Sequence, residues 1–289
     1  MDVAAYFAER GALVDRHLAA LVPPRGEAAA PRTLQAAMRH LLLPGGKRLR
    51  PVLAMAASEA VGGTPEAALP VAAAVELVHT YSLIHDDLPC IDDDTERRGG
   101  PTVHVAFDEA LAVLAGDALL ALAFEVLSSG ASGSAAPETE RVLATVGELA
   151  AAAGATALVG GQVDDLALES CAGPGDELAE QVESIHRRKS AALLTAAITG
   201  GARLGGAGET ELEVLRRFGG DVGVAFQIAD DLLDQGNEDG CSLVRVFGPE
   251  RARARAEVLL DGALGLIEAW GDRAEPLREC ARSAVRRSR

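Results

Sequence analysis

The chain has 289 residues, of which 48% are hydrophobic and 3% aromatic, and its formal net charge at pH 7 is −16. This length allows a sizeable buried core, and the abundance of Ala and Leu over aromatic residues favours helices over strands. The negative charge argues against broad binding to nucleic acids or anionic membranes, so an anionic ligand would need a local basic site.

The N-terminal residues 1–22 alternate apolar and charged side chains at helical spacing. They lack the basic start and unbroken apolar run of an export signal. We judge that no segment approaches the roughly 18 to 20 apolar residues of a membrane span, so none is predicted. Cys90, Cys171, Cys241 and Cys280 show neither metal-type nor paired spacing. We therefore expect a cytoplasmic protein without a structural zinc or a disulfide framework.

Breaks rich in Gly, Pro and Ser divide the chain into long segments with a 3.6-residue apolar period. No break is long or polar enough for an interdomain linker, and no repeat is visible. We predict an all-α, single-domain helical bundle over residues 1–289, whose long central helices can enclose an elongated cavity. The predicted helices, in chain order, are 3–21, 31–43, 48–61, 66–88, 103–127, 138–159, 176–199, 209–234, 249–269 and 272–286.

The first acidic cluster, residues 85–94, ends an apolar segment and holds five carboxylates in nine residues. Asp86 and Asp92 would point in different directions on an unbroken helix. Pro89 cannot continue the helix smoothly, because it lacks an N–H and disfavours helical geometry at the residue before it. A distorted turn can therefore bring both carboxylates to one cation.

A second cluster, Asp230, Asp231 and Asp234, also ends a long apolar segment. Asp230 and Asp234 are four residues apart, on one helix face at about 6 Å. Oxygen ligands with room left for water and phosphate suit Mg²⁺. A single run of this kind is more often a solvated helix end, but two such runs after apolar segments predict a metal site.

Two basic motifs accompany the acidic clusters. Lys47, Arg48 and Arg50 begin a predicted helix, where free N–H groups and the helix dipole favour phosphate, and Arg97 and Arg98 follow the first cluster. The alternative is that these cations only neutralise nearby aspartates. His79, Lys189 and Gln227 are further polar groups that could face the same cavity, although a histidine on an apolar helix is often a packed core residue.

These motifs, taken together and in order, resemble those of the trans-polyprenyl diphosphate synthases, and most closely the bacterial farnesyl diphosphate synthases (geranyltranstransferases). The resemblance implies an antiparallel helical bundle around a deep central cavity, usually in a homodimer. It also implies head-to-tail joining of isopentenyl diphosphate to an allylic diphosphate such as dimethylallyl or geranyl diphosphate. The motifs are GGKRLRP at 45–51, HTYSLIHDDLPCIDDD at 79–94, RRGGPTVH at 97–104, AGDALL at 115–120, GGQVDDL at 160–166, RRKSAAL at 187–193 and FQIADDLLD at 226–234.

The resemblance also implies roles for individual residues, with three Mg²⁺ ions holding the allylic diphosphate between the two clusters. The principal ligands and catalytic aspartates would be Asp86, Asp92 and Asp230, with Lys189 also catalytic. Asp87, Asp231 and Asp234 would support the metal directly or through water. The isopentenyl diphosphate site would comprise Lys47, Arg50, His79 and Arg98. The allylic site would comprise Arg97, Lys189, Ser190 and Gln227.

Product length is expected to depend on what blocks the cavity below the first cluster. Tyr81 lies about one and a half turns before Asp86. Within the family, an aromatic residue here, with the inserted pair Pro89 and Cys90, resembles enzymes that stop at the C15 product, farnesyl diphosphate. Ser82 is small, which leaves the C20 product, geranylgeranyl diphosphate, as the alternative.

The match fails after the second cluster, where the family usually carries lysines. Cys241 stands where one is expected, the loop is short, Gly100 replaces a common lysine, and no lysine follows Lys189. We expect weaker allylic binding or slower turnover.

A terpene cyclase and a non-catalytic subunit stay open as alternatives. A phosphohydrolase of the HD type is a remoter one, because it leaves the basic motifs unexplained.

Overall fold

The computed structural model describes residues 1–22, 30–43, 45–129, 136–168, 175–233 and 241–286. Most of these residues are helical, and the two short strands pair with each other, Glu96 opposite Pro101 and Arg97 opposite Gly100. The predicted all-α fold is confirmed. The elements are α1 (Val3–Leu21), α2 (Arg32–Leu42), α3 (Leu49–Ala60), α4 (Leu69–Asp86), β1 (Glu96–Arg97), β2 (Gly100–Pro101), α5 (Val103–Ala106), α6 (Glu109–Ser129), α7 (Ala136–Ala153), α8 (Leu158–Ala167), α9 (Gly175–Ile185), the π-helix η1 (His186–Ala191), α10 (Ala192–Leu204), α11 (Glu209–Leu233), α12 (Leu243–Phe247), α13 (Pro249–Leu266), the 3₁₀-helix η2 (Glu268–Ala274) and α14 (Glu275–Val285).

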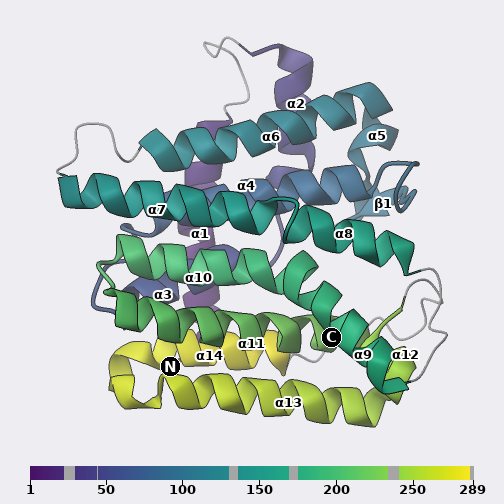
Figure 1. The fold of residues 1–289 in the computed structure, drawn as a ribbon. Helices are drawn as coiled ribbons and strands as arrows, with labels where there is room; N and C mark the ends of the chain where they lie inside the picture. Colours follow the sequence, from purple (N-terminus) through teal and green to yellow (C-terminus); the bar gives the residue numbers. More distant parts are fainter. Residues whose placement is uncertain (23–29, 44, 130–135, 169–174, 234–240, 287–289) are drawn as a thin grey trace.

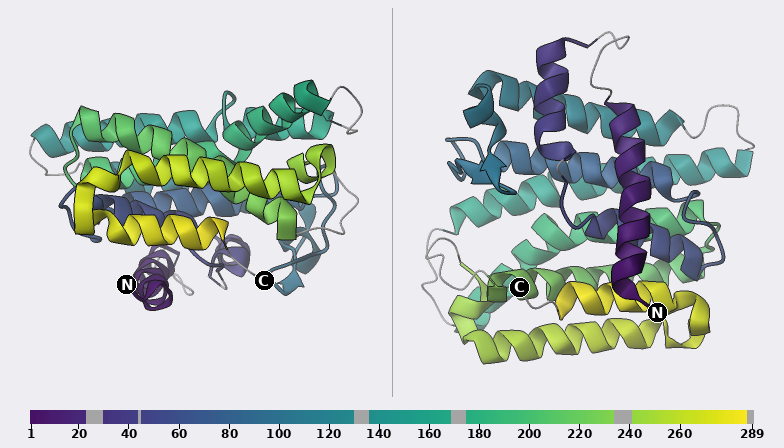
Figure 2. Two further views of the ribbon diagram at one scale, coloured as in Figure 1. Left: turned by 90° about the horizontal axis from the view of Figure 1, so that it is seen from below. Right: turned by 180° about the vertical axis from the view of Figure 1, so that it is seen from behind.

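The long helices lie in successive rows, from α6 through α7, α10 and α11 to α13 (Figure 1). Helices α1 and α2 run across the back of these rows (Figure 2). The central helix α4 packs on α6, α3 packs on α10, and α11 packs on both α10 and α13. This arrangement places Asp86, at the C-terminal end of α4, and Asp230, near that of α11, beside one cavity of the bundle.

Three predicted helices differ from the observed ones. The predicted helix 103–127 divides at Phe107, and the carboxylate of Asp108 then accepts a hydrogen bond from the backbone N–H of Leu111 at 2.7 Å, as at a helix start. The predicted helix 138–159 ends at Ala153, and α8 begins separately at Leu158. The predicted helix 176–199 continues without a break, but its middle is wound as a π-helix. The short helix α12 was not predicted.

Glycines allow close contact between α3 and α10 in the core. A Cβ atom on Gly201 would lie 2.0 Å from the carbonyl oxygen of Ala54, and one on Gly205 would lie 2.5 Å from Oγ of Ser58. The two backbones therefore touch directly, which only glycine permits. This contact fixes α3, and with it the basic motif at its start, against the centre of the bundle.

The statement that no segment approaches the composition of a membrane span is wrong. By length and composition, α6 (mean hydropathy 2.1) and the stretch 138–167 (1.7) are apolar enough to cross a membrane. Core helices of soluble proteins pass the same test. Helix α6 buries Ala112, Ala115 and Leu119 and packs against α4 and α2, and the second stretch is interrupted between α7 and α8. Packing in the bundle accounts for part of the apolar composition of α6, of whose apolar window 39% is buried.

Candidate active site

Two neighbouring cavities bring the acidic and basic motifs together. The first, which we call the aspartate cavity, has a volume of about 470 Å³ and is lined by both Asp86 of α4 and Asp230 of α11. The second, the basic cavity, has a volume of about 610 Å³ and is lined by Lys47 and Arg98. Arg50, His79 and Phe226 line both cavities. Residues far apart in the chain thus converge on two spaces with a common wall.

The first cluster folds as a tight turn after α4. The backbone N–H of Asp92 donates to the carbonyl oxygen of Asp86 at 2.9 Å, and Asp93 takes a left-handed conformation with φ 54°. The predicted distortion after Pro89 is therefore present, and it brings Asp92 back to Asp86. Asp86 lines the cavity, whereas the side chain of Asp92 is exposed and is not among the lining residues.

Electrostatic repulsion in this cluster favours a cation. Burial raises the pKa of Asp86 to about 7, an effect that Lys189 opposes and Asp92 reinforces. Burial also raises the pKa of Asp92. Within the described part of the chain, no three His, Cys, Asp or Glu side chains are arranged to hold a metal by themselves. This donor set still fits Mg²⁺, which usually takes one or two carboxylates and completes its shell with water and phosphate oxygens.

Asp87 and Arg97 face each other instead of the cavity. Arg97 binds the carboxylate of Asp87 and also that of Asp94, at 2.7 Å in the second case. Asp87 is fully buried, and its Oδ2 has no partner among the described residues. Neither Asp87 nor Arg97 lines either cavity. The expected roles of Asp87 toward metal and of Arg97 toward the allylic diphosphate therefore gain no support from this arrangement.

The second cluster holds a chain of polar contacts beside the cavity. Ser190 donates to Oε1 of Gln227 at 2.7 Å, and Nε2 of Gln227 donates to Asp231 at 3.0 Å. Nε2 of His186 lies 3.4 Å from the same carboxylate, but burial lowers the pKa of His186 to about 4, so the ring is neutral at pH 7. Asp231 thus orients Gln227. Asp234, a predicted metal ligand, lies outside the described residues.

The π-helix η1 positions Lys189 and Ser190 in the wall of the aspartate cavity. A Cβ on Gly161 would lie 2.5 Å from the backbone nitrogen of Lys189, so α8 meets η1 backbone to backbone. Asp165 then binds Nζ of Lys189 at 2.5 Å. Sequence reasoning had noted the motif 160–166 without assigning roles within it. Two residues of this motif were not predicted to belong to the site: Asp165, which binds Lys189, and Gln162, which lines the aspartate cavity.

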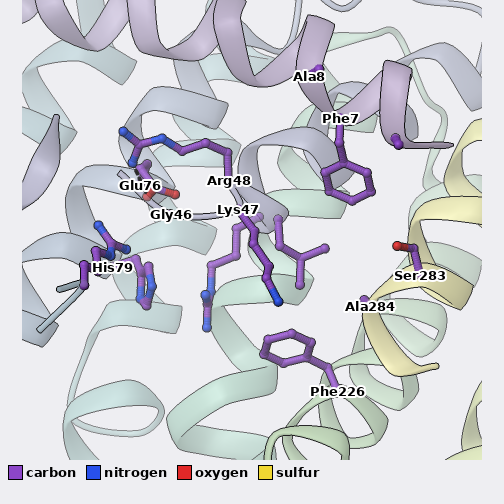
Figure 3. A pocket seen from close by; sticks show the side chains of 14 residues that line it. Phe7, Ala8, Gly46, Lys47, Arg48, Glu76, His79, Phe226, Ser283 and Ala284 are labelled. Carbon is purple, nitrogen blue, oxygen red and sulfur yellow. Dashed lines mark hydrogen bonds and ion pairs between the residues drawn. The ribbon is translucent and has the colours of Figure 1, made fainter. Parts of the chain in front are cut away.

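The basic residues at the start of α3 all line the basic cavity, but they differ in how far other side chains engage them. Arg48, with a left-handed φ of 51°, is buried and donates to Asp15 at 2.8 Å, to Glu76 at 2.5 Å and to the carbonyl oxygen of Leu42 at 2.6 Å. Figure 3 shows it turned toward Glu76, while Lys47 extends toward Phe226. Arg48 also lines the basic cavity, but these three partners engage its guanidinium, so its expected role toward phosphate gains no support.

The other members of the predicted isopentenyl site, Arg50, His79 and Arg98, line the basic cavity, and the first two also line the aspartate cavity. Arg50 is partly buried, and its Nε has no partner in the described part of the structure. Burial lowers the pKa of Arg50. Burial, followed by the neighbouring arginines, holds the pKa of His79 well below its ordinary value, so His79 is a neutral hydrogen-bonding group. Arg98 donates to the carbonyl oxygen of Leu41 at 3.0 Å, which ties it to the end of α2.

Tyr81 and Ser82 line the aspartate cavity, as the proposed chain-length residues should. The ring of Tyr81 packs edge to face on His85, with 5.7 Å between centroids. His85 is itself fixed, because its Nε2 lies 3.1 Å from the carbonyl oxygen of Val113 and no Cβ at Gly116 would fit beside it. The hydroxyl of Ser82 donates to the carbonyl oxygen of His79 at 2.9 Å. The aromatic wall is thus rigidly supported.

One expectation about the cysteines is wrong. Cys241 is disulfide-bonded, although its spacing did not indicate a pair, because spacing does not reveal which thiols a fold brings together. Cys90 and Cys280 are free. The cysteine pattern therefore no longer supports a reducing compartment, and the residue that stands where a lysine was expected is part of a disulfide.

Comparisons with known proteins identify the family and the fold. The family model described as "Polyprenyl synthetase" matches residues 31–240. The chloroplastic geranylgeranyl pyrophosphate synthase 12 of Arabidopsis thaliana is 45% identical over 272 residues, which cover 89% of this chain and 74% of that protein. The chloroplastic geranylgeranyl pyrophosphate synthase 11 of the same plant is 47% identical over 262 residues, which cover 86% of this chain and 72% of that protein. Among solved structures, an FPP/GFPP synthase of Zymomonas mobilis has a TM-score of 0.88 at 39% identity, covering 98% of this chain and 99% of that one. A geranyltransferase of Legionella pneumophila has a TM-score of 0.86 at 32% identity, with 99% and 98% covered.

Proposed function

Because the chain belongs to the polyprenyl synthetase family, we propose that it is a prenyltransferase that condenses isopentenyl diphosphate head-to-tail with dimethylallyl or geranyl diphosphate. The observation that carries this proposal is the convergence of Asp86 and Asp230 on one cavity that shares a wall with a second, basic cavity. Two adjacent sites suit two diphosphate substrates whose reacting carbons must meet. We treat residues 1–289 as one polyprenyl synthase domain.

The cavity lining supports metal roles for Asp86 and Asp230, and the roles of the other aspartates rest on the family resemblance. Asp86, Asp92 and Asp230 would hold Mg²⁺, three ions being expected with the allylic diphosphate bound, and Asp87 and Asp234 are further proposed ligands. When bound, the ions would neutralise charge that builds on the departing diphosphate. Lys189, held by Asp165, adds a positive charge beside Asp86, and Ser190 and Gln227 supply polar contacts on the same wall.

The basic cavity would bind isopentenyl diphosphate through Lys47, Arg50 and Arg98, with neutral His79 donating a hydrogen bond. The allylic C–O bond breaks, and its electron pair leaves with the diphosphate. The isopentenyl double bond then attacks the allylic cation, and a proton is lost to the released diphosphate. No protein nucleophile takes part. Apolar wall residues such as Leu193 and Phe226 exclude water that would quench the cation.

Incubation with isopentenyl diphosphate, each allylic diphosphate and Mg²⁺, followed by product chromatography, tests the proposal. We expect longer prenyl diphosphates that form only when both substrates are present. Conversion of the allylic diphosphate alone would instead indicate a cyclase, which has no use for the basic cavity. The absence of any prenyl product with every allylic substrate would contradict the proposal and favour a non-catalytic subunit.

The product length is a separate part of the proposal. Tyr81 on the cavity wall supports the C15 product, farnesyl diphosphate. Several relatives named above carry geranylgeranyl in their names, which supports the C20 product at least as well. The proposal therefore covers both products, and the C15 expectation from the sequence is not confirmed.

Replacing Tyr81 by alanine should lengthen the products by at least one five-carbon unit, because it removes a ring that is only 6% exposed on the cavity wall. Tyr81→Phe is the matched control, since it keeps the ring and its contact with His85, and it should retain the native product distribution. Chromatography of the products from both variants provides the measurement. An unshifted distribution for Tyr81→Ala would remove the residue from the chain-length role.

We also propose a homodimer. The cytoplasmic location expected from the sequence stays a proposal, and the disulfide of Cys241 argues against it. Large apolar side chains are exposed on α6 and α7, among them Leu114 (56% exposed) and Leu143 (70% exposed). A second copy packed over these side chains would bury them and release water. Light scattering coupled to size-exclusion chromatography should give a dimer mass for the native chain and a monomer mass after Leu114→Glu with Leu143→Glu. A native monomer would contradict the dimer.

A further inference from the structure

The hairpin of β1 and β2 carries Arg98 into the wall of the basic cavity, but it is too small to hold its own shape. Each strand has two residues, and an isolated two-stranded hairpin is at best marginally stable in water. Arg98 and Gly99 at its tip both have left-handed backbones, with φ 55° and 77°, which is unfavourable for an arginine. The place of Arg98 in the cavity therefore depends on contacts from outside the hairpin.

The C-terminal end of α2 supplies two of these contacts. Nε2 of His40 lies 2.7 Å from the carbonyl oxygen of Pro101 on β2, and it must carry the hydrogen, because a carbonyl oxygen only accepts. The carbonyl oxygen of the next residue, Leu41, accepts from Nη1 of Arg98 at 3.0 Å. Two consecutive residues of one helix thus hold the second strand and the tip of the hairpin.

This end of α2 is a fixed support. Leu41 and Leu42 are buried, and α2 packs on α4, α5 and α6. The ring of His40 also meets Phe107 edge to face, with 5.6 Å between centroids, which fixes its orientation toward β2. The last carbonyl groups of a helix lack partners within it and carry the negative end of its dipole, so a guanidinium there is favoured.

His40 lines neither cavity, so it can act on a substrate only through the hairpin. The guanidinium of Arg98 is seated closely on the other side of the hairpin as well, since a Cβ atom on Gly46 would lie 3.3 Å from its Nη2. A shift of β2 would move Arg98 away from Gly46 and from Lys47 beside it. The hydrogen bond from His40 to Pro101 opposes that shift.

We propose that His40 is a positioning residue, which holds the hairpin so that Arg98 faces the diphosphate of isopentenyl diphosphate; this rests on the proposed function. His40→Leu removes the N–H and should raise the KM for isopentenyl diphosphate about 3- to 10-fold, the effect of one hydrogen bond between neutral groups. The kcat and the KM for the allylic diphosphate should stay native. His40→Gln keeps an N–H that can reach the carbonyl oxygen of Pro101 and should restore most of the native KM. His17→Leu, on α1 and lining neither cavity, is the control and should match the native enzyme.

A double-mutant cycle separates positioning from general support of the fold. In an Arg98→Met chain, His40→Leu should raise the KM for isopentenyl diphosphate no further, because its effect passes through Arg98. His40→Met serves as a second variant should His40→Leu fold poorly, and circular dichroism checks the fold of each.

Three results would overturn the inference: a native KM in a folded His40→Leu chain, full additivity with Arg98→Met, or no recovery in His40→Gln. A native chain that elongates no allylic diphosphate would instead refute the proposed function, so the two failures are distinguishable.

Discussion

Asp86→Asn and Asp230→Asn should each lower kcat of prenyl transfer by about 10²- to 10³-fold, the loss typical when one preoriented electrostatic group is removed. Both substitutions keep the size of the side chain and remove a negative charge from the wall of the aspartate cavity. With fewer anionic ligands, Mg²⁺ should bind more weakly and the departing diphosphate should be less well neutralised. Initial rates over a series of Mg²⁺ concentrations measure both effects.

Asp93→Asn is a matched control from within the first cluster. Asp93 is exposed, lines neither cavity and has φ 54°, a conformation that asparagine tolerates. The variant should keep its rate and its Mg²⁺ dependence. Equal losses in the Asp93 and Asp86 variants would mean that only the total charge of the cluster matters, and near-native rates for Asp86→Asn and Asp230→Asn would refute the proposed site.

Arg48→Met should lower the free energy of unfolding by about 3 to 5 kcal/mol, the usual consequence of removing one partner from a buried ion pair. The side chains of Arg48 and Glu76 are each 3% exposed, and Nη1 of Arg48 donates to Glu76 at 2.5 Å. Without the guanidinium, Glu76 would be left as an uncompensated buried charge, and α1 would lose its link through Asp15. Denaturant unfolding monitored by circular dichroism measures the change.

Arg50→Met is the matched partner of this experiment, because it removes the same group two residues away. Nε of Arg50 has no partner among the described residues, so this variant should be as stable as the native chain. It should instead raise the KM for isopentenyl diphosphate by about 10- to 100-fold, the value of a charge-assisted hydrogen bond. Similar stability losses in both variants would show that the division between structural and ligand-binding arginine is incorrect.

The helices that the sequence predicted best are those with a long, regular apolar period. The predicted helices 3–21 and 209–234 match α1 and α11 closely, because each depends mainly on its own residues. The predicted helix 103–127 failed at Phe107, where no Gly or Pro marks the break. The disulfide of Cys241 was missed because the spacing of cysteines in a sequence does not reveal which thiols a fold brings together.

The amino-acid sequence by itself determined the chemistry that is available: two acidic clusters, basic motifs near them, and a helical chain apolar enough to surround them. Only the tertiary structure decided which of these groups face a ligand. Arg48 and Arg50 have identical side chains, and they differ because Arg48 donates hydrogen bonds to Glu76 and Asp15, whereas Nε of Arg50 has no partner among the described residues. Gln162 could not be distinguished from any other glutamine until the fold buried its amide without a partner. The apolar period of a helix predicts on which face of that helix a side chain lies. The groups that the side chain contacts come from other helices, and those contacts form only when the whole bundle packs.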